Sequence, residues 1–389
     1  MFITSPNPRV GCVLVAADGG VIGLGHTQAA GGAHAEIMAL RDAGSRNLGT
    51  QGATAYVTLE PCSHVGRTGP CCDALVAAGI QKVVACATDP NPLVAGQGFD
   101  RLRKAGVRVE ILDPGQPQAR AARELNIGFF SRMVRQTPWL RLKIAASLDG
   151  KTALQNGVSQ WITSPAARAD GHAWRARACA VLTGIGTVLQ DKPRLDVRLV
   201  ETPRQPHLVI VDSLLQTPLD APLFETQRKI FIYAAIGNAE RAAALALRGA
   251  SVITLAGRQP DGSLTHKVDL AAMLKDLGQR GINELHVEAG HKLNGSLVRE
   301  GLVDEFLVYL APKLIGQGAD MAHFGPLETL ADAMPLRFES TGLVGPDLRI
   351  LARVAGRDKF LHGDGASIAT EPRSKTETMQ KAPGEPPPA

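Results

Sequence analysis

The alternation of short apolar runs with helical segments constrains the fold of this chain more than any other feature of its sequence. VGCVLV (10–15), ATAYVTL (53–59) and KVVACA (82–87) are bounded by Gly, Pro or Asn, which is typical of buried strands. Two segments with helical patterns, residues 34–43 and 71–78, lie between these runs. Strands that alternate with helices predict an α/β sandwich around a mostly central sheet.

The same alternation resumes after a break at Pro138. Helices are expected at residues 238–249 and 270–281. Strand candidates begin with LRLKIAASLDG and continue at residues 180–186, 207–212, 229–235, 251–256, 284–290 and 304–316. Because 389 residues exceed one ordinary domain of about 100–200 residues, we predict two α/β domains, residues 1–135 and 136–355.

Apolar periodicity ends near Ala355. Residues 356–389 are rich in Pro, Gly, Ser, Thr and charged side chains. Such a segment does not bury enough apolar surface to offset the entropy that ordering would cost. We therefore predict a disordered tail over residues 356–389.

The overall composition argues against several classes of protein. Hydrophobic residues make up 44% and charged residues 20%, and no apolar run reaches the roughly 18–20 residues of a membrane span. The net charge of +5 comes without a dense Lys/Arg block, which argues against nucleic acid as a partner. The N-terminal segment lacks the features of a secretion signal, and six cysteines are few for this length. We predict a cytoplasmic protein without a disulfide framework.

A zinc site is predicted in the first domain. HAE places His34 two residues before Glu36, and PCSHVGRTGPCC adds Cys62 and Cys71. A hydrolytic zinc site needs about three protein ligands, here His34, Cys62 and Cys71, and an open position where a bound water loses a proton near neutral pH. Glu36 would then pass this proton to a leaving nitrogen, which is the general acid/base role in the nucleotide deaminases.

HAE alone would more often be a surface histidine and a solvated carboxylate than part of a metal site. The order of NPRVG, HAE, PC and a second Cys in one α/β domain favours zinc. The usual spacing is P-C-x-x-C, whereas eight residues separate Cys62 from Cys71. In this longer loop we expect the cationic and hydroxyl groups of His64, Arg67 and Thr68 to bind a phosphate or sugar beside the metal. Cys72 is expected to be a buried structural residue.

Four segments match a known family in order: PNPRVGC, HAE, TLEPCSHVGRTGPCCDALVAAGI and DPNPLVAGQG. The first half of the chain resembles the deaminase half of the bifunctional pyrimidine deaminase/reductase family of riboflavin biosynthesis. This resemblance implies a cytidine-deaminase-like α/β/α sandwich, with one zinc ion per chain on His34, Cys62 and Cys71. It also implies that Glu36 shuttles protons and that Asn7 contacts the ribose phosphate end of the substrate.

The first half departs from this family at two places. The family usually has an amphipathic helix before TxPNPxVG, and here the chain starts only a few residues ahead of that motif. We expect either a start farther upstream or a deaminase domain without this supporting helix. Gly69 stands where the family commonly has proline, which should loosen the substrate loop without removing a ligand.

The second half resembles the reductase half of the same family, whose fold is similar to dihydrofolate reductase. KIAASLDGKTAL, SQWITS, LTGIGTVLQDKPRLDVR and residues 287–316 carry this resemblance. GHKLNGSL follows a strand and opens a helix, where free backbone N–H groups face a phosphate, although such glycines more often mark a turn. The resemblance implies NADPH as the hydride donor. The implied cofactor contacts are Ala145, Trp161, Thr187, Asp191, Gly290, His291, Lys292, Leu293, Asn294, Gly295 and Ser296.

The same resemblance implies a set of substrate contacts in the second domain. They are Ser159, Arg175, Leu195, Arg198 and Glu288. Two arginines suit a ribose phosphate, because a guanidinium fork pairs bidentately with phosphate oxygens. An arginine chosen blindly is more often a surface charge.

The segment DKPRLDVR departs from the family's more usual DDPxLTxR. Lys192 replaces an acid and Asp196 replaces a threonine. We expect these two changes to alter substrate affinity. Hydride transfer should remain possible, because no group that it needs is lost. Lys143 and Asp149 are further candidates for this site, without an assigned role.

These features together predict two successive reactions on one substrate. The first is zinc-dependent deamination of 2,5-diamino-6-ribosylamino-4(3H)-pyrimidinone 5′-phosphate, and the second is reduction of the ribosyl side chain to ribityl by NADPH. The main alternative is a reductase with an inactive deaminase domain. A nucleoside or tRNA deaminase would not need the second domain, and a nucleic-acid-binding module would need a closed four-ligand zinc site and a basic face. Because the family is oligomeric, we also expect a homo-oligomer, a dimer or tetramer.

Overall fold

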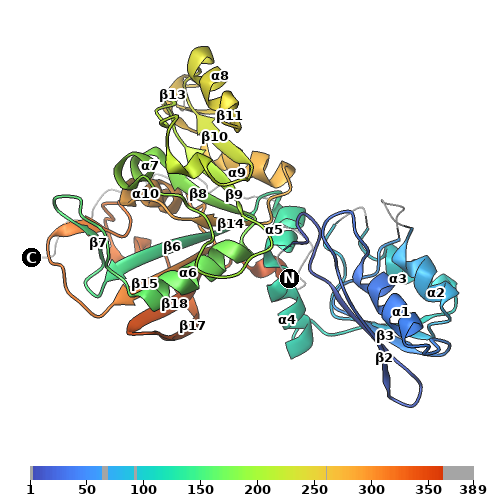
Figure 1. The fold of residues 1–389 in the computed structure, drawn as a ribbon. Helices are drawn as coiled ribbons and strands as arrows, with labels where there is room; N and C mark the ends of the chain where they lie inside the picture. Colours follow the sequence, from blue (N-terminus) through green and yellow to red (C-terminus); the bar gives the residue numbers. More distant parts are fainter. Residues whose placement is uncertain (1–2, 64–68, 92–93, 260, 362–389) are drawn as a thin grey trace, which may run out of the picture.

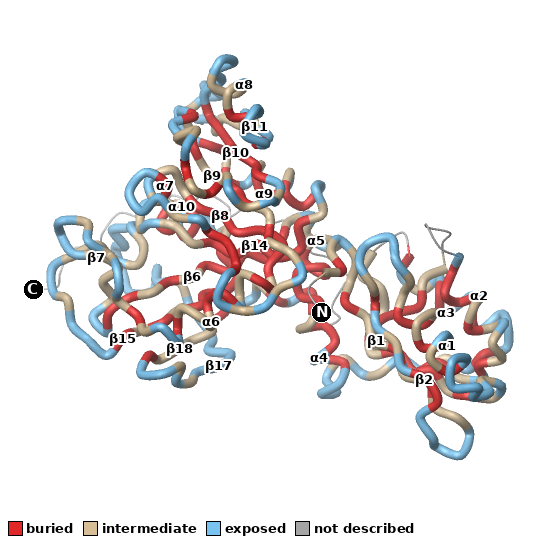
Figure 2. The backbone as a smooth tube through the Cα atoms, viewed as in Figure 1, coloured by how far each residue is buried: buried red, intermediate tan, exposed pale blue. Residues whose placement is uncertain are grey.

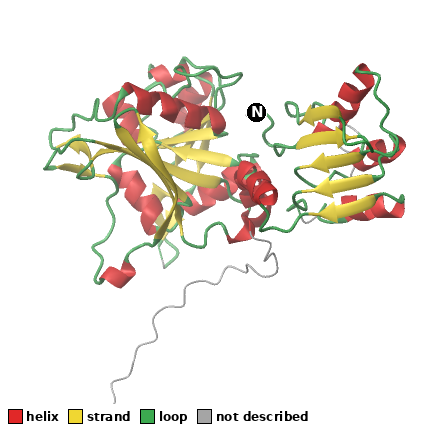
Figure 3. Cartoon of the chain, turned by 90° about the horizontal axis from the view of Figure 1, so that it is seen from below, coloured by secondary structure: helices red, strands yellow, loops and turns green. Residues whose placement is uncertain are grey.

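A computed structural model describes residues 3–63, 69–91, 94–259 and 261–361 of the chain. Its two large sheets are separate, one of five strands and one of nine, and each is covered by helices (Figure 1). The view from below shows the two sheets apart, with helices between them (Figure 3). Both expected α/β domains are therefore present. No helix among the described residues is both long and apolar enough to span a membrane.

The smaller sheet has the strand order β2-β1-β3-β4-β5. Strand β1 is antiparallel to β2 and β3, whereas β3, β4 and β5 are parallel. The strands are β1 (Gly11–Val15), β2 (Val21–His26), β3 (Thr54–Val57), β4 (Lys82–Ala85) and β5 (Arg108–Ile111). The helices are α1 (Ala35–Ser45), α2 (Cys71–Ala77) and α3 (Gln97–Lys104). The sequence had indicated α1, α2, β1, β3 and β4, but not β2, β5 or α3.

Helix α1 lies unusually close to strand β2. A Cβ atom on Gly25 would lie 2.0 Å from the carbonyl oxygen of Ala35, and one on Gly23 would lie 2.3 Å from that of Ala39. Both distances are far below van der Waals contact, so only glycine allows the helix to approach the strand in this way. Ala35 and Ala39 are fully buried in the resulting core. This packing fixes the first turn of α1, which carries Glu36.

Two helices connect the domains: α4 (Pro117–Leu125) and α5 (Ile127–Arg135). One apolar cluster packs α5 against both domains. Besides residues of α5, this cluster contains Leu59 from the first domain and Trp139 from the second. Polar contacts also cross between the domains, since Arg9 Nη1 donates to Glu284 Oε1 at 2.6 Å. Residues 117–135 therefore pack between the two sheets.

The larger sheet has the order β11-β10-β9-β8-β14-β6-β15-β18-β17 and is parallel up to β15, after which β18 and β17 run antiparallel. Its strands are β6 (Trp139–Ser147), β8 (Ala180–Gly184), β9 (His207–Val211), β10 (Ile230–Ala234), β11 (Ala250–Thr254), β14 (Glu284–Val287), β15 (Glu305–Ala311), β17 (Leu336–Val344) and β18 (Asp347–Val354). Its helices are α6 (Pro165–Arg177), α7 (Ile185–Asp191), α8 (Ala239–Leu247), α9 (Leu270–Gln279) and α10 (His291–Arg299). Two short pairs complete the domain, β7 (Lys151–Leu154) with β16 (Gly318–Asp320) and β12 (Ala256–Arg258) with β13 (Leu264–Val268).

Each face of the larger sheet has its own core. Leu182 belongs to the cluster that contains residues of α9 and α10, while its neighbour Val181 belongs to the cluster that contains Leu245 of α8. Successive residues of a strand point to opposite faces, so this division follows from the pleat. Buried residues accordingly run along the strands of both sheets (Figure 2). The uninterrupted apolar runs of the sequence reflect strands that are buried on both faces.

The chain remains packed beyond Ala355, where the sequence analysis placed the start of the tail. A short 3-10 helix, η3 (Lys359–Leu361), buries Phe360 and Leu361. The ring of Phe360 lies edge-on to that of Trp139, with 6.0 Å between the ring centroids. These two apolar residues anchor the segment, and the rest of the expected tail, residues 362–389, lies outside the described residues.

Candidate active sites

The three predicted zinc ligands meet at the ends of two helices. His34 is the N-cap residue of α1, Cys71 is the first residue of α2, and Cys62 lies in the loop after β3. His34 Nδ1 lies 3.4 Å from Cys62 Sγ and 3.3 Å from Cys71 Sγ. The three ligand atoms all lie within 4.8 Å of one another, and they form the single group of this kind found among the described residues.

This arrangement fits a zinc ion. Ligands roughly 2.0–2.3 Å from a tetrahedral zinc lie about 3.5 Å from one another, close to the distances between His34 Nδ1 and the two sulfurs. One imidazole and two thiols are also ligands that zinc prefers, and three of them leave a fourth position open. Hydrogen bonds with Cys71 and His34 lower the pKa of Cys62 to about 4, against the effect of burial. This thiol is therefore prepared to ligate as a thiolate.

Glu36 lies directly beside the ligands. It is the second residue of α1 and is only 3% exposed. Burial, together with the negative charge of Cys62, raises the pKa of Glu36 to about 7. A carboxyl group with a pKa near the working pH is suited both to accept and to donate a proton.

Cys72 and Glu60 support this site from behind. Cys72 is fully buried, and its Sγ lies 3.3 Å from the carbonyl oxygen of Pro61, in agreement with the expected structural role. Glu60 was not singled out from the sequence. Its buried carboxylate accepts hydrogen bonds from the backbone N–H groups of Asp89, Gly96 and Gly98, at 3.1, 3.0 and 2.8 Å. Glu60 thus ties Asp89, Gly96 and Gly98 to the segment that leads from β3 to Cys62.

The remaining deaminase candidates stay predictions. Asn7 is partly buried in the turn before β1, where its backbone N–H donates to the carbonyl of Thr4 at 2.9 Å. His64 and Arg67, together with Thr68, lie outside the described residues. Gly69 is exposed, with open space around the position of a Cβ atom.

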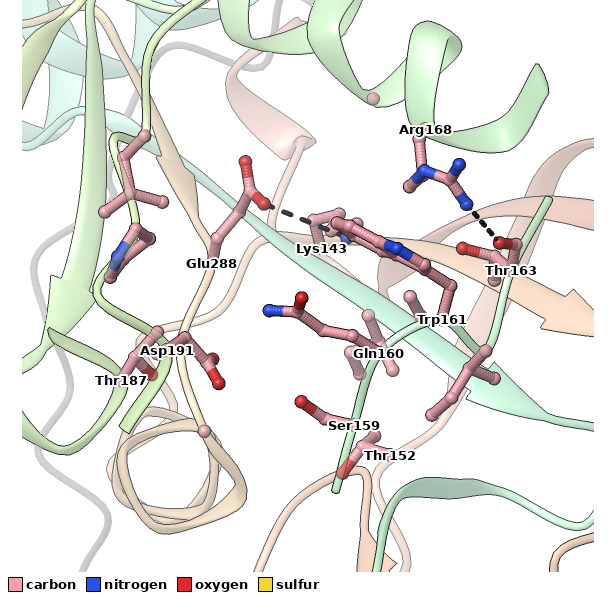
Figure 4. A pocket seen from close by; sticks show the side chains of 18 of the residues that line it. Lys143, Thr152, Ser159, Gln160, Trp161, Thr163, Arg168, Thr187, Asp191 and Glu288 are labelled. Atoms are coloured by element: carbon pink, nitrogen blue, oxygen red, sulfur yellow. Dashed lines mark hydrogen bonds and ion pairs between the residues drawn. The ribbon is translucent and has the colours of Figure 1, made fainter. Parts of the chain in front are cut away.

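The second domain contains a cavity of about 700 Å³ (Figure 4). Ser159, Thr187, Asp191 and Glu288 surround one space in this view, although they come from segments far apart in the sequence. The predicted residues that line the cavity are Ala145, Ser159, Trp161, Arg175, Thr187, Asp191, Leu195, Arg198, Glu288, Gly290, His291 and Asn294. The volume lies within the range of about 300–1,000 Å³ that is usual for ligand pockets.

Four predicted residues of α10 do not line this cavity: Lys292, Leu293, Gly295 and Ser296. Leu293 instead packs near Gly184, where a Cβ atom would lie 3.2 Å from its side chain. Gly295 allows a close approach of the backbone, because a Cβ atom there would lie 1.8 Å from the carbonyl oxygen of His323. The contacts of Leu293 and Gly295 hold α10 in place, so that the helix directs its N-terminus, at Gly290, to the cavity.

Glu288 is the electrostatic centre of the cavity. Its carboxylate accepts from Arg175 Nε and from Arg175 Nη2, and Lys143 Nζ lies 3.8 Å away. Burial opposes ionisation of Glu288, but the charge of Arg175 outweighs burial and holds the pKa of Glu288 well below its ordinary value. Lys143 therefore belongs to this site. Asp149 does not line the cavity, and its carboxylate accepts from the backbone N–H of Gly316 at 2.7 Å in a neighbouring turn.

Several lining residues were missed from the sequence, among them Arg168 and His172 on α6. The guanidinium of Arg168 lies 4.4 Å from the ring centroid of Trp161, and His172 Nδ1 accepts from the backbone N–H of Arg198 at 3.1 Å. Residues 168, 172 and 175 recur at helical spacing, so Arg175 could have pointed to the other two. The face of α6 that carries them forms one wall of the cavity.

The fold and the two sites define a class of protein, a bifunctional enzyme that joins a zinc-dependent deaminase domain to a reductase domain. Residues 2–87 match the family described as "Cytidine and deoxycytidylate deaminase zinc-binding region", and residues 138–350 match "RibD C-terminal domain". Both domains are therefore present, which favours the bifunctional enzyme over a reductase alone.

Similar proteins place the chain within one family. It is 44% identical over 354 residues to "Riboflavin biosynthesis protein RibD" of Escherichia coli (strain K12), covering 89% of this chain and 93% of that protein. It is 40% identical to the RibD protein of Aquifex aeolicus, covering 89% and 92%. The chain belongs to the RibD family of bifunctional deaminase/reductases of riboflavin biosynthesis.

Solved structures support the same assignment over most of the chain. "Acinetobacter baumannii RibD, form 2" has a TM-score of 0.79 and 39% identity, covering 91% of this chain and 94% of that chain. A deaminase/reductase from Thermotoga maritima has a TM-score of 0.79 and 30% identity, with the same coverage. The likeness therefore includes both domains.

Proposed function

We propose that the chain performs two successive steps on one phosphoribosylaminopyrimidine. The first is hydrolytic deamination of 2,5-diamino-6-ribosylamino-4(3H)-pyrimidinone 5′-phosphate, and the second is reduction of the ribosyl side chain to ribityl with NADPH. The observation that carries this proposal is the buried Glu36 beside His34, Cys62 and Cys71, in a chain whose second domain encloses a charged cavity. The Thermotoga maritima relative is named for these two activities.

In the deaminase site, His34, Cys62 and Cys71 would hold one zinc ion per chain. The chemistry that zinc supplies when bound is the acidification of a water molecule, which makes a nucleophile available near neutral pH. Glu36 takes the proton of this water as oxygen bonds to the ring carbon that bears the amino group. Glu36 then gives the proton to the amino nitrogen, the carbon–nitrogen bond breaks, and ammonia leaves. Burial of Glu36 keeps bulk water away from this proton transfer.

In the reductase site, the chain's own residues bind and orient the cofactor and the substrate. The chemistry that NADPH would supply when bound is a hydride for the reduction of C1 of the ribose. Helix α10 presents its N-terminus at Gly290 to the cavity, a place where backbone N–H groups and the helix dipole favour a phosphate of the cofactor. Arg198 lines the same cavity and suits the ribose phosphate of the substrate.

Product analysis tests this proposal directly. Purified, zinc-quantified protein is incubated with the diaminopyrimidine ribose phosphate, with and without NADPH. We expect ammonia in both reactions, the deaminated ribosyl compound alone without NADPH, and the ribityl compound with it. Reduction of the undeaminated substrate, or no ammonia from zinc-loaded protein, would overturn the proposed order of steps.

We also propose that the chain is a cytoplasmic homo-oligomer that binds neither nucleic acid nor membrane, with domains at residues 1–135 and 136–355. The cysteines are all unpaired, which suits a reducing compartment. Strand β17 is an edge strand with exposed apolar side chains, Leu336, Phe338 and Leu343, and such an edge favours pairing with another chain.

The oligomer is tested by Phe338→Glu, with Leu247→Glu as the matched control, because Leu247 is 89% exposed on α8 at the other end of the sheet. We expect Phe338→Glu to lower the molar mass in light scattering and Leu247→Glu to leave it unchanged. Equal masses of all three proteins would contradict an interface at β17.

A further inference from the structure

The loop between α7 and β9 forms part of the cavity wall and is anchored through its backbone. Arg228 donates to the carbonyl oxygens of Arg194 and Leu195, both at 2.5 Å. Arg175 Nη1 donates to the carbonyl oxygen of Asp196 at 2.8 Å. Leu195 has a φ of 52°, in the left-handed region that a non-glycine residue adopts only when its surroundings impose it. The loop is thus a fixed support for its side chains.

Asp196 lies behind this wall and holds two of the arginines that line it. Its side chain is only 8% exposed and does not itself line the cavity. Arg198 Nη1 donates to Asp196 Oδ1 at 2.5 Å, and Arg194 Nε donates to Asp196 Oδ2 at 3.1 Å. Both arginine side chains are about half-exposed, so the buried carboxylate is the anchor and the guanidinium groups are what it positions.

Arg198 has donors left over for a ligand. Its backbone N–H donates to His172 Nδ1, and its side chain uses Nη1 for Asp196. Within the part of the chain that the structure describes, no hydrogen bond is seen from Nε or Nη2 of Arg198. A guanidinium that is already oriented loses less rotamer entropy when it binds a phosphate. The anchor therefore prepares Arg198 for a bidentate partner.

We propose that Asp196 is a positioning residue for the phosphate of the reductase substrate, acting through Arg198 and, to a smaller extent, through Arg194. This inference rests on the proposed function, because it assumes that Arg198 meets the ribose phosphate. A carboxylate close to a phosphate site also repels the anion, since like charges oppose each other. Here Asp196 is turned away from the cavity and is neutralised by two guanidinium groups, so orientation outweighs repulsion.

The test compares Asp196→Asn and Asp196→Thr with the wild type in the holoenzyme. Reductase KM and kcat are measured on the deaminated aminouracil ribose phosphate and on the same compound without its phosphate, and KM is also measured for NADPH. Asp220→Asn is the matched control, because Asp220 is exposed in the same domain. Arg198→Ala reports separately on the phosphate site.

We expect Asp196→Asn to raise KM for the phosphorylated substrate about three- to tenfold, the range of an ion pair that is partly shielded from solvent. The values of kcat, KM for the dephosphorylated compound and KM for NADPH should stay within about twofold. Asp196→Thr should behave in the same way, which controls for misfolding of one variant. A lower KM would show that repulsion dominates, and a parallel rise for both substrates would show a merely structural role. Either result overturns the inference.

Arg198→Ala separates this inference from the proposed function. If Arg198→Ala abolishes the preference for the phosphorylated substrate and Asp196→Asn leaves it unchanged, the role of Asp196 is wrong and the phosphate site stands. If Arg198→Ala also preserves that preference, the placement of the phosphate at Arg198 is wrong, and the inference falls with it.

Discussion

The deaminase site and the reductase cavity are built in opposite ways. The predicted metal ligands come from one stretch of the chain, from His34 to Cys71, and two of them lie at helix N-termini. The reductase cavity draws side chains from between Lys143 and Ala319, carried by strands, helices and loops on both sides of the sheet. The first site depends on local chain geometry, whereas the second depends on the topology of the whole domain.

The two sites also differ in the direction in which the pKa of their buried carboxylate is shifted. Glu36 is next to a thiol of lowered pKa and has its own pKa raised toward neutrality, which suits proton transfer. Glu288 is next to Arg175 and Lys143 and is held ionised, which suits binding and orientation. The difference indicates that acid/base chemistry belongs to the first domain, while charge pairing in the second serves a cofactor that carries the reaction.

The largest effect should follow from loss of a metal ligand. Cys71→Ser replaces a buried thiol of the predicted zinc site by a poorer ligand. We expect zinc, measured by atomic emission, to fall far below one per chain, and ammonia release to fall at least about a thousandfold. Reductase activity on the deaminated compound should stay within about twofold, because the sites share no residue. Cys72→Ser is the control, since Cys72 is buried next to the ligands without joining them.

A smaller effect, confined to the second domain, is expected from Glu288→Gln. The amide leaves the charges of Arg175 and Lys143 without their carboxylate. We expect reductase kcat/KM to fall about a hundredfold, as for a broken pair of buried charges, with ammonia release unchanged. The exposed Glu328→Gln serves as the control. Equal activity of both variants would contradict the role of Glu288 as the electrostatic centre.

The two domains meet at Glu284, which accepts a hydrogen bond from Arg9 of the first domain. Glu284→Gln should therefore affect the stability of the chain. Burial alone would raise the pKa of Glu284, but Arg177, Arg9 and Arg141 outweigh it and hold this pKa below its ordinary value. A carboxyl group with a depressed pKa in the folded state stabilises it above the unfolded pKa of about 4.5, and this stabilisation is lost as the pH falls below that value.

At neutral pH we therefore expect Glu284→Gln to lower the free energy of unfolding by about 2 kcal/mol, which denaturant titration measures. The difference from the wild type should shrink as the pH falls below about 4.5. A difference that stays constant down to pH 3 would mean that charge pairing at Glu284 is not its cause.

The sequence was most informative where function depends on spacing. His34, Cys62 and Cys71 were predicted to act together, and the structure brings their ligand atoms within 4.8 Å of one another, although their roles stay predictions. Arg175 and Arg198 were predicted only from family resemblance, since nothing local in the sequence shows that α6 and the loop after α7 contact each other at the cavity. The anchoring by Asp196 depends on that meeting, and so no sequence pattern could show it.

Two parts of the fold, β17 and the segment around Phe360, were not predicted because their sequences show no regular pattern of buried residues. Strand β17 has mostly exposed side chains, and its register shifts between Phe338 and Ser340, so it lacks the apolar alternation that indicates a strand. Phe360 and Leu361 are too few to form a periodic pattern, yet Trp139 offers them an apolar surface. In both cases the deciding contacts come from residues distant in the sequence.

The central claim is that two independent sites act in one chain, and Glu36→Gln tests it most directly. On one preparation, zinc content, ammonia release from the diaminopyrimidine ribose phosphate, and NADPH oxidation with the deaminated compound are measured. We expect about one zinc per chain, ammonia release lowered at least about a hundredfold, and NADPH oxidation within about twofold of the wild type. Retained ammonia release, or loss of both activities in a folded, zinc-loaded protein, would contradict the claim of two independent sites.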